Sequence, residues 1–522
     1  MALSDRGPAR EPADDGLVGL SARRAHRGRR RVREAGRGPA GIVTAPRRDG
    51  APRGGRPKQT ARGARAHDGP SRSASPAREA AARVLERVET DASFADNALE
   101  TELTSRRLEP RDAALATELA YGTLRWQRYL DWILAPHSRR RLELLDARVR
   151  VLLRMTAYQI AFLERVPAFA AVNDAVTLAP RVPGVSAFVN AVLRSFARRG
   201  AREREPAPPR DPIEALAARC SFPTWIAERW VARYGREDAE SLMRALNERP
   251  PLTLRANRLR TTRDALGRRL ADEDGLDWRP TGLAPEGLVV GPGGMPGEWR
   301  AFADGGFAVQ DEASMLIARL LAPEPGSTVA DVCAAPGTKT THLAELMDNR
   351  GRIVAFDREP TRLARVGEAA ARLGISIIDT RAGAVEALAP AFRDACDGVL
   401  VDAPCSNLGV VRRNPEVKWR RRPSDLALAS RRQSEILGAA GAMVRPGGRL
   451  VYATCSLEPE ENDAVAQAFL AAQPGFRLDP PGDFPLPLDS AGWLRCLPHR
   501  HGTDGFSAVR FRRSALSGIT SP

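Results

Sequence analysis

Three kinds of sequence feature are absent from this chain of 522 residues, and each absence excludes a class of protein. No run approaches the roughly 18 consecutive apolar residues of a membrane span, and no apolar segment follows the first residues as it does in a secretory signal. The six cysteines are scattered without Cys-x-x-Cys spacing, which argues against both a disulfide framework and a zinc site. We therefore expect a cytoplasmic protein with no membrane segment and no metal.

Aromatic residues are absent from positions 1–75, which contain no Phe, Trp or Tyr. This segment has 18 Lys and Arg against 7 Asp and Glu, so 11 of the chain's 16 excess positive charges lie here. Such a composition cannot bury enough apolar surface to offset the entropy of ordering the chain, which predicts a disordered basic tail. The tail either tethers RNA through phosphate contacts or is a solvated extension without a selected role, and we favour the extension.

The whole chain is basic, with 80 Lys and Arg against 64 Asp and Glu and a pI near 10.6. This balance predicts a polyanionic partner, and nucleic acid is the first candidate. The length exceeds what one hydrophobic core usually organises, so several domains are expected after the tail.

Residues 76–200 have the apolar spacing of helices, as in Val84, Leu85 and Val88 and in the stretch 149–160, and predict an all-α domain. A proline-rich linker at 205–212 marks the next boundary. Residues 212–300 mix both patterns, which predicts a small α+β module. Arg255, Arg258 and Arg260 beside its first strand either contact phosphates or form a solvated edge, and the pattern leaves both open.

Strands and helices alternate from 301 to 515. An apolar run at 328–333 is followed by a tight loop at 334–339, a helix at 340–347 and a second strand at 352–357. Further strands are expected at 375–379, 398–401 and 449–454. This α/β pattern predicts a doubly wound, mainly parallel, Rossmann-like sheet, whose ligands lie at the carboxyl ends of the strands.

The loop after the first of these strands suits a nucleotide-type cofactor, although it contains one glycine, Gly337, and not Gly-x-Gly-x-x-Gly. Asp357 ends the second strand, 20 residues past Gly337, where a carboxylate can accept hydrogen bonds from ribose hydroxyls. The alternative for Asp357 is capping of the helix that starts near Pro360.

Two cysteines follow consecutive strands, Cys405 in Asp-Ala-Pro-Cys and Cys455 in Ala-Thr-Cys-Ser. Consecutive strands of this topology usually neighbour each other, so both thiols are expected at one sheet edge near the cofactor loop. There Lys339, Arg412 or Arg413 can adjust a thiol pKa. A thiol nucleophile beside a cofactor suits methylation of a pyrimidine, which stays inert until a nucleophile adds to it. The remaining cysteines read as small buried hydrophobes: Cys220, Cys333, Cys396 and Cys496.

The α/β region contains four distinctive motifs: Cys333-Ala-Ala-Pro-Gly-Thr-Lys339, Asp402-Ala-Pro-Cys405, Arg413-Asn-Pro-Glu-Val-Lys-Trp419 and Tyr452-Ala-Thr-Cys-Ser-Leu-Glu-Pro-Glu-Glu-Asn462. Together they resemble one family, the Nol/Nop/Sun RNA cytosine-C5 methyltransferases. The stretch 76–200, with Phe188-Val-Asn-Ala-Val-Leu-Arg194, resembles the NusB-like RNA-binding domain of the bacterial branch that methylates one cytosine of 16S rRNA. The resemblance covers about 76–515.

The resemblance implies a methyltransferase that acts as a monomer on 16S rRNA, with S-adenosylmethionine as its cofactor. Cys455 would add to carbon 6 of the cytosine and Cys405 would assist release, while Asp402 and Lys339 would bind the base. The implied cofactor-binding residues are Cys333, Ala334, Ala335, Pro336, Gly337, Thr338, Lys339, Asp357, Arg362 and Asp402.

Two positions depart from the family pattern. Thr338 stands where a second glycine is usual, and the segment 381–384 lacks the acid that commonly contacts adenine. Thr338 is acceptable if its φ is negative. A non-catalytic RNA-binding ribosome-assembly factor is the rival hypothesis, and the joint presence of Cys405, Cys455, Asp402 and Lys339 argues against it. A DNA cytosine methyltransferase would explain neither the Thr-Cys motif nor the helical domain.

Overall fold

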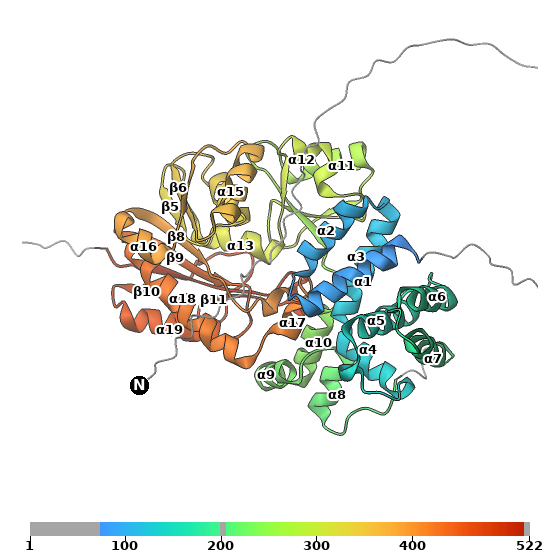
Figure 1. Cartoon of the computed structure of the whole chain (residues 1–522). Coiled ribbons are helices and arrows are strands. Elements are labelled where there is room, and N and C mark those ends of the chain that lie inside the picture. The colour runs from blue at the N-terminus through green and yellow to red at the C-terminus, as the bar shows by residue number, and fades with distance from the viewer. Residues whose placement is uncertain (1–73, 199–204, 516–522) are drawn as a thin grey trace, which may run out of the picture. The chain divides into compact units, whose positions relative to one another are not determined.

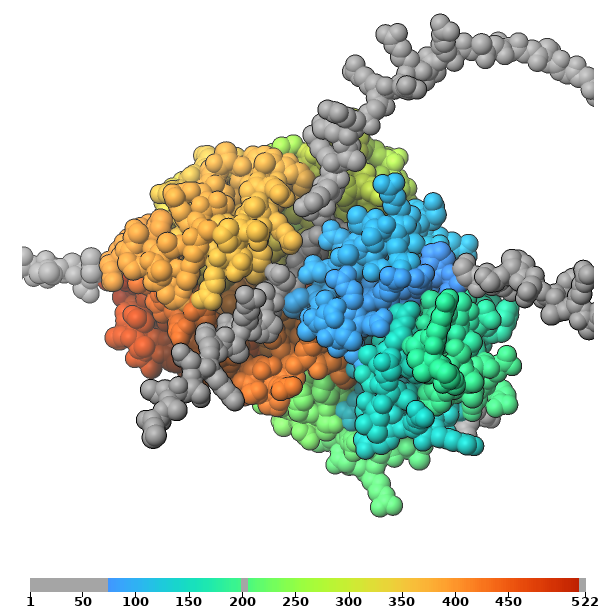
Figure 2. Space-filling view, in the orientation of Figure 1, coloured from blue at the N-terminus to red at the C-terminus, as the bar shows by residue number. Residues whose placement is uncertain are grey.

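The computed structural model describes residues 74–198 and 205–515, which are coloured in Figures 1 and 2. The basic tail expected at 1–75 lies outside the described residues, apart from its last two positions. Within the described ranges, no helix is long and apolar enough to cross a membrane. The same ranges contain no group of three or more His, Cys, Asp and Glu side chains that could hold a metal ion.

The first described region is helical, as the apolar spacing predicts. Val84, Leu85 and Val88 are all buried in its core, which excludes water from one face of each helix. Asp146 begins the central helix α5, because its carboxylate accepts a hydrogen bond from the backbone N–H of Arg148. The α-helices are α1 (Pro76–Thr90), α2 (Ala95–Arg106), α3 (Pro110–Arg125), α4 (Gln127–Leu134), α5 (Ala147–Phe162), α6 (Ala168–Leu178) and α7 (Val185–Ala197). Two short 3-10 turns, η1 (Ala135–His137) and η2 (Leu142–Leu144), lie between α4 and α5.

Three helices follow the proline-rich linker: α8 (Pro212–Arg219), α9 (Thr224–Tyr234) and α10 (Arg236–Leu246). The carboxylate of Asp211 caps α8 by accepting hydrogen bonds from two backbone N–H groups. The apolar side chains of these helices, including Trp230, share a core with Leu408 and Leu457 of the large α/β region. The helices therefore pack against that region, whereas the sequence grouped them with the strands that follow.

Those strands form a separate antiparallel sheet in the order β2-β3-β1-β4. It has its own core, covered by α11 (Arg263–Asp274) and α12 (Arg300–Ala303), with the 3-10 turn η4 (Pro296–Glu298) before α12. Its last strand lies beyond residue 300, where the sequence placed the domain boundary, because a strand of three residues has too little pattern to recognise. The strands are β1 (Leu252–Ala256), β2 (Trp278–Pro280), β3 (Gly287–Val290) and β4 (Phe307–Val309).

The large sheet confirms the predicted doubly wound α/β fold. Its order is β10-β12-β9-β8-β5-β6-β7. Strands β7, β6, β5, β8 and β9 are parallel, β12 pairs antiparallel with β9, and β10 and the additional β11 pair antiparallel with β12. The sequence did not predict these antiparallel strands. The strands are β5 (Thr328–Asp331), β6 (Arg352–Asp357), β7 (Ile378–Ala382), β8 (Cys396–Asp402), β9 (Val444–Thr454), β10 (Phe476–Leu478), β11 (Trp493–Cys496) and β12 (Phe506–Arg513).

Helices cover both faces of this sheet (Figure 1). Along β9, Val451 and Ala453 join the core on the side of α13 and α14, whereas Leu450 and Tyr452 join the core on the side of α18 and α19. This alternation follows from the period of two in a strand. The helices are α13 (Glu312–Leu321), α14 (Thr338–Leu346), α15 (Pro360–Leu373), α16 (Val385–Leu388), α17 (Val417–Arg420), α18 (Pro423–Met443), α19 (Asp463–Ala472) and α20 (Pro498–His501). The 3-10 turns are η5 (Ala389–Phe392), η6 (Leu408–Val410) and η7 (Pro459–Glu461).

Candidate active site

Cys405 and Cys455 lie together at the carboxyl ends of two neighbouring parallel strands. Asp402 at the end of β8 is in register with Ala453 of β9, so the chain leaves both strands at the same level. The two sulfur atoms are 3.2 Å apart and both side chains are buried. The expectation that both thiols open on one sheet edge is therefore confirmed.

Asn407 contacts both thiols. Its Oδ1 lies 3.0 Å from Cys455 Sγ and 3.4 Å from Cys405 Sγ, where it can accept a hydrogen bond from either thiol. The hydrogen bond with Cys455, followed by burial, raises the pKa of Cys405 well above its ordinary value. Cys405 is thus a neutral thiol at neutral pH. No sequence pattern singled out Asn407, whose only signal is its place two residues after Cys405.

Lys339 and Asp402 form an ion pair at the same edge. Lys339 Nζ, in the first turn of α14, lies 2.7 Å from Asp402 Oδ2. The ammonium also lies 4.9 Å from the ring centroid of Phe506, a cation–π contact that the sequence did not predict because Phe506 begins the distant strand β12. A cation and a carboxylate are thus fixed where strands β5 and β8 end.

Arg412 and Arg413, which the sequence suggested as modulators of a thiol pKa, are used elsewhere. Arg412 Nη2 lies 3.2 Å and Arg413 Nη2 3.0 Å from Asp311 Oδ2, and the Nε atom of each arginine donates to Asp504. Neither Lys339 nor either arginine is among the causes of the pKa shift of Cys405. Both guanidinium groups are paired with carboxylates instead, as buried charges require.

Two glycines next to this ion cluster, Gly409 before Arg412 and Gly505 after Asp504, support Cys455 through close backbone contacts. Gly409 N–H donates to the carbonyl of Cys455 at 2.8 Å, and Gly505 N–H donates to the carbonyl of Gly409 at 2.9 Å. A Cβ atom at Gly409 would lie 2.3 Å from the Gly505 oxygen and 2.7 Å from the Cys455 oxygen. Only glycine fits at this position.

The expected cofactor loop, 333–339, has the backbone conformation that its sequence suggests, and it contacts Asp357. Gly337 has a φ of 105°, which favours glycine, and the next residue, Thr338, begins α14 without a positive φ. Asp357 Oδ2 accepts from the backbone N–H of Ala335 at 3.1 Å, and its Oδ1 accepts from Glu359 N–H at 3.0 Å. Asp357 therefore joins the loop to Glu359, the residue before α15. Binding of a ribose by Asp357 stays a prediction. Arg362 lies in the first turn of α15.

Arg255, for which the sequence left two interpretations open, is neither exposed nor at a solvated edge. It is fully buried and forms an ion pair with Glu345 of α14 at 2.7 Å. Its Nη1 donates to the carbonyl of Thr338 at 2.7 Å. The small sheet therefore supports the helix that carries Lys339. Arg258 and Arg260 contact Asp348 and the carbonyl of Asp304, respectively.

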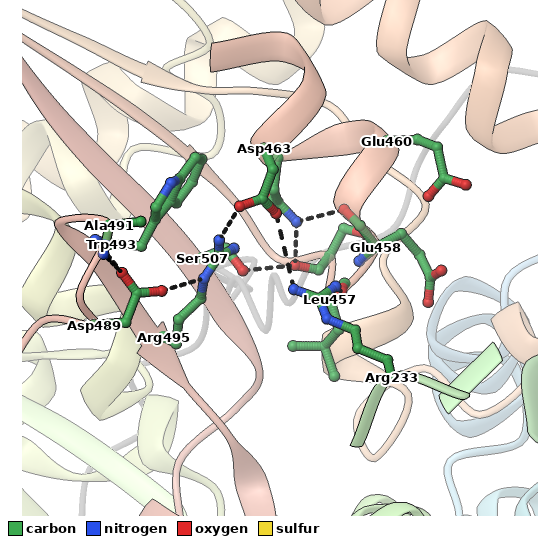
Figure 3. A network of polar contacts seen from close by, with 12 residues as sticks. Arg233, Leu457, Glu458, Glu460, Asp463, Asp489, Ala491, Trp493, Arg495 and Ser507 are labelled. Atoms are coloured by element: carbon green, nitrogen blue, oxygen red, sulfur yellow. Dashed lines mark hydrogen bonds and ion pairs between the residues drawn. The ribbon is translucent and has the colours of Figure 1, made fainter. Parts of the chain in front are cut away.

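The loop that follows Cys455 is held from two sides (Figure 3). From α9, Arg229 pairs with Glu458 at 2.7 Å, and Arg233 donates to the carbonyl of Leu457. On the other side, Arg495 of β11 pairs with Asp463 at 2.5 Å. The segment after Cys455 is thus joined to α9 outside the large sheet and to β11 within it.

Three parts of the chain match models of known protein families. Residues 318–512 match the model of the 16S rRNA methyltransferase RsmB/F, and residues 75–198 match that of the NusB family. Residues 222–293 match the ferredoxin-like domain of RsmF/B-like methyltransferases.

Relatives and solved structures agree. The chain is 36% identical over 444 residues to the probable ribosomal RNA small subunit methyltransferase B of Bacillus subtilis, covering 84% of this chain and 98% of that protein. The crystal structure of PH0851 has a TM-score of 0.72 at 29% identity, covering 84% of this chain and 99% of that one. The structure of NSun6 from Pyrococcus horikoshii with SFG has a TM-score of 0.51 at 25% identity, covering 56% and 98%. The chain therefore belongs to the RsmB/F family of 16S rRNA methyltransferases.

Proposed function

We propose that this chain, acting as a monomer in the cytoplasm, transfers a methyl group from S-adenosylmethionine to carbon 5 of one cytosine in 16S rRNA through a covalent adduct on Cys455. The observation that carries the proposal is the contact between two buried thiols, with sulfur atoms 3.2 Å apart, at the edge where Lys339 and Asp402 pair. The helical domain would dock the RNA and take no part in the chemistry.

The chemistry requires a nucleophile because carbon 5 of cytosine does not react with a methyl donor by itself. Addition of the Cys455 thiolate to carbon 6 makes carbon 5 an enamine carbon that can attack the methyl group. After transfer the proton on carbon 5 leaves to a base, and the bond between sulfur and carbon 6 breaks. The neutral thiol of Cys405 then donates a hydrogen bond to the departing Cys455 thiolate, which is how it would assist release.

Asp402 and Lys339 would bind the base. A carboxylate accepts from the exocyclic N4 amino group, and an ammonium stabilises negative charge that develops in the ring. The two groups are already paired at 2.7 Å, so a bound base would meet charges that need little rearrangement. Preorganisation of this kind lowers the barrier because no solvent must reorient during the reaction.

The residues present fit S-adenosylmethionine, which supplies the electrophilic methyl group when it is bound. Segment 333–339 and Asp357 meet where β5 and β6 end, and Asp402 and Arg362 border them on β8 and α15. The buried carboxyl of Asp331 at the end of β5, whose pKa burial raises to about 7, accepts from Thr340 Oγ1 at 2.7 Å and adds a polar group at this strand end. The NSun6 structure that this fold matches was solved with SFG, which supports a related ligand here. At 381–384 no acid is present, and the nearby Asp379 pairs with Arg352 and Arg381.

Methyl transfer from labelled S-adenosylmethionine to unmodified 16S rRNA tests the proposal. We expect label on a single cytosine, at carbon 5, and a protein–RNA adduct that survives denaturation. Binding of RNA without transfer to any base would instead support the non-catalytic assembly factor. Label at a ring nitrogen or ribose oxygen would contradict the role of Cys455 as nucleophile.

A further inference from the structure

The two cysteine loops are joined a second time, one residue beyond the thiols. Ser406 follows Cys405 and Ser456 follows Cys455, and the two serine hydroxyl oxygens lie 3.0 Å apart. Both hydroxyls lie 2.5 Å from the same atom, Oε2 of Glu461. The thiol contact and the serine contact are therefore parallel links between the same two loops.

Glu461 is fully buried, and donors surround both of its oxygen atoms. Its Oε1 accepts from the backbone N–H of Ser406 at 2.7 Å and from Gln433 Nε2 at 3.1 Å. With the two serine hydroxyls, four donors occupy the four lone pairs that a carboxylate offers. A carboxylate buried without such partners would be strongly unfavourable, so the site is built for this group.

Gln433 extends the link to the other side of Cys405. Its Nε2, on α18, also donates to the carbonyl of Pro404 at 2.9 Å. The residues before and after Cys405 are thus held through one carboxylate, which also holds the residue after Cys455. By contrast, the neighbouring Asn462 donates to the carbonyls of Ser456 and Glu458 and so stays within the Cys455 loop.

We propose that Glu461 is a positioning residue that keeps Cys405 and Cys455 in contact by binding Ser406 and Ser456 together. This inference rests on the proposed function and deepens it, because it identifies what sets the distance between the nucleophile and the thiol that assists release. Glu461 touches neither sulfur atom and acts through the two serines.

The distance between the thiols can be tested without any methyl transfer. Diamide oxidises two adjacent thiols to a disulfide, losing one hydrogen from each sulfur while diamide is reduced to a hydrazine. In the full chain we expect Glu461→Ala to slow formation of the Cys405–Cys455 disulfide by roughly tenfold or more. Mass spectrometry of the linked peptides measures the rate of disulfide formation. Glu416→Ala is the matched control, since it removes an equally buried carboxylate whose hydrogen bond comes from the backbone N–H of Ala95 in the helical domain. It should leave the rate unchanged.

The enzymatic readout separates positioning from folding. Glu461→Ala should lower kcat by roughly 100-fold, as expected for a displacement of about 1 Å, with KM values for RNA and S-adenosylmethionine within about twofold of the original. Glu461→Gln should recover much of kcat, because its amide oxygen accepts from Ser406 N–H while its NH2 group donates to hydroxyls that can rotate.

Each outcome decides one point. An unchanged disulfide rate and kcat in Glu461→Ala would overturn the inference, as would equal loss in Glu416→Ala. Failure of Glu461→Gln to recover either readout would also overturn it, because that variant keeps the link. If the original chain methylates no cytosine, the proposed function fails, while the disulfide rates still test the role of Glu461.

Discussion

Two lysines at two sites show how differently this molecule uses a buried lysine. The chain has three lysines among its 80 basic residues, and the two within the described ranges, Lys339 and Lys418, are both buried against an aromatic ring. Lys339 pairs with the carboxylate of Asp402 at the candidate active site. Lys418 instead donates to two neutral oxygens, the carbonyl of Arg125 and Oδ1 of Asn247, each at 2.8 Å.

The surroundings of Lys418 explain the motif Arg-Asn-Pro-Glu-Val-Lys-Trp. Helix α3 ends at Arg125, and the last carbonyls of a helix lack partners within it. Lys418 donates to the carbonyl of Arg125, and Trp419 Nε1 donates to that of Leu124 at 2.7 Å. Arg420 reaches the carbonyl of Val88 in the last turn of α1. The motif thus joins the α/β region to the helical domain, whereas Lys339 lies at the candidate active site.

The largest effect is expected at the thiols beside Lys339. Cys455→Ala should abolish turnover and leave no covalent adduct, because no thiolate then activates carbon 5. Cys405→Ala should instead slow release, so that protein and RNA accumulate as a complex that resists denaturation and disappears on RNase treatment. Cys396→Ala, a buried cysteine within β8, is the control and should keep turnover. An adduct from Cys455→Ala, with none from Cys405→Ala, would exchange the two roles.

Much of this edge could be predicted from the sequence because each strand is a short apolar run followed by a distinctive loop. The second strand was expected at 352–357 and β6 has these bounds. The third was expected at 375–379, whereas β7 is Ile378–Ala382, because β7 is the edge strand and exposes polar residues that carry no apolar pattern.

Long-range polar pairing could not be predicted. Asp311 and Asp504 lie about a hundred residues from the arginines that they bind, and no local period connects them. Arg255 reads as a surface charge in its strand, yet the packing of two domains buries it against Glu345. The roles of Glu461 and Asn407 likewise depend on two loops that meet only in the folded chain.

The next largest effect should separate the two lysines. Lys339→Met leaves Asp402 without its cation, so we expect kcat/KM to fall roughly 100- to 1000-fold, as when one preorganised electrostatic contact is lost. Lys418→Met, the same substitution at the other buried lysine, should change kcat less than about threefold, because it lies outside the chemistry. Single-turnover methyl transfer measures both. Equal losses of activity in the two variants would show that Lys339 is no more important for methyl transfer than Lys418.

Lys418→Met should instead lower stability. Replacing the amino group leaves the Arg125 carbonyl and Asn247 Oδ1 without a donor, at a cost of about 1–3 kcal/mol in the free energy of unfolding. Urea unfolding followed by fluorescence measures the difference. Lys339→Met, whose partner is partly exposed, should lose less. If Lys418→Met is as stable as the original chain, the contacts of Lys418 do not stabilise the junction between the two domains.

The pH dependence of that difference has a definite sign. Burial lowers the pKa of Lys418 well below its ordinary 10.5 in the folded chain. Below pH 10.5 the unfolded chain therefore binds a proton that the folded chain resists, so stability from this group rises as the pH increases towards 10.5. The stability gap between the original chain and Lys418→Met should widen from about pH 8 to about pH 10. A gap that narrows would contradict the lowered pKa.

The smallest effect is expected from the segment that belongs to neither site. Deleting residues 1–73 preserves Ser75, whose N–H donates to Asp174, and removes no residue assigned to the chemistry. We expect kcat/KM to change by no more than about twofold at moderate salt, because the thiol edge and the domain junction stay intact. Residues 1–75 carry 18 basic side chains, so any phosphate contacts they make release counterions, and their loss should make RNA affinity less dependent on salt concentration. RNA binding measured across a salt series, beside methyl transfer, distinguishes the two properties. If the shortened chain keeps the same unfolding midpoint but no longer methylates its cytosine, the prediction is wrong and the tail is required for methyl transfer.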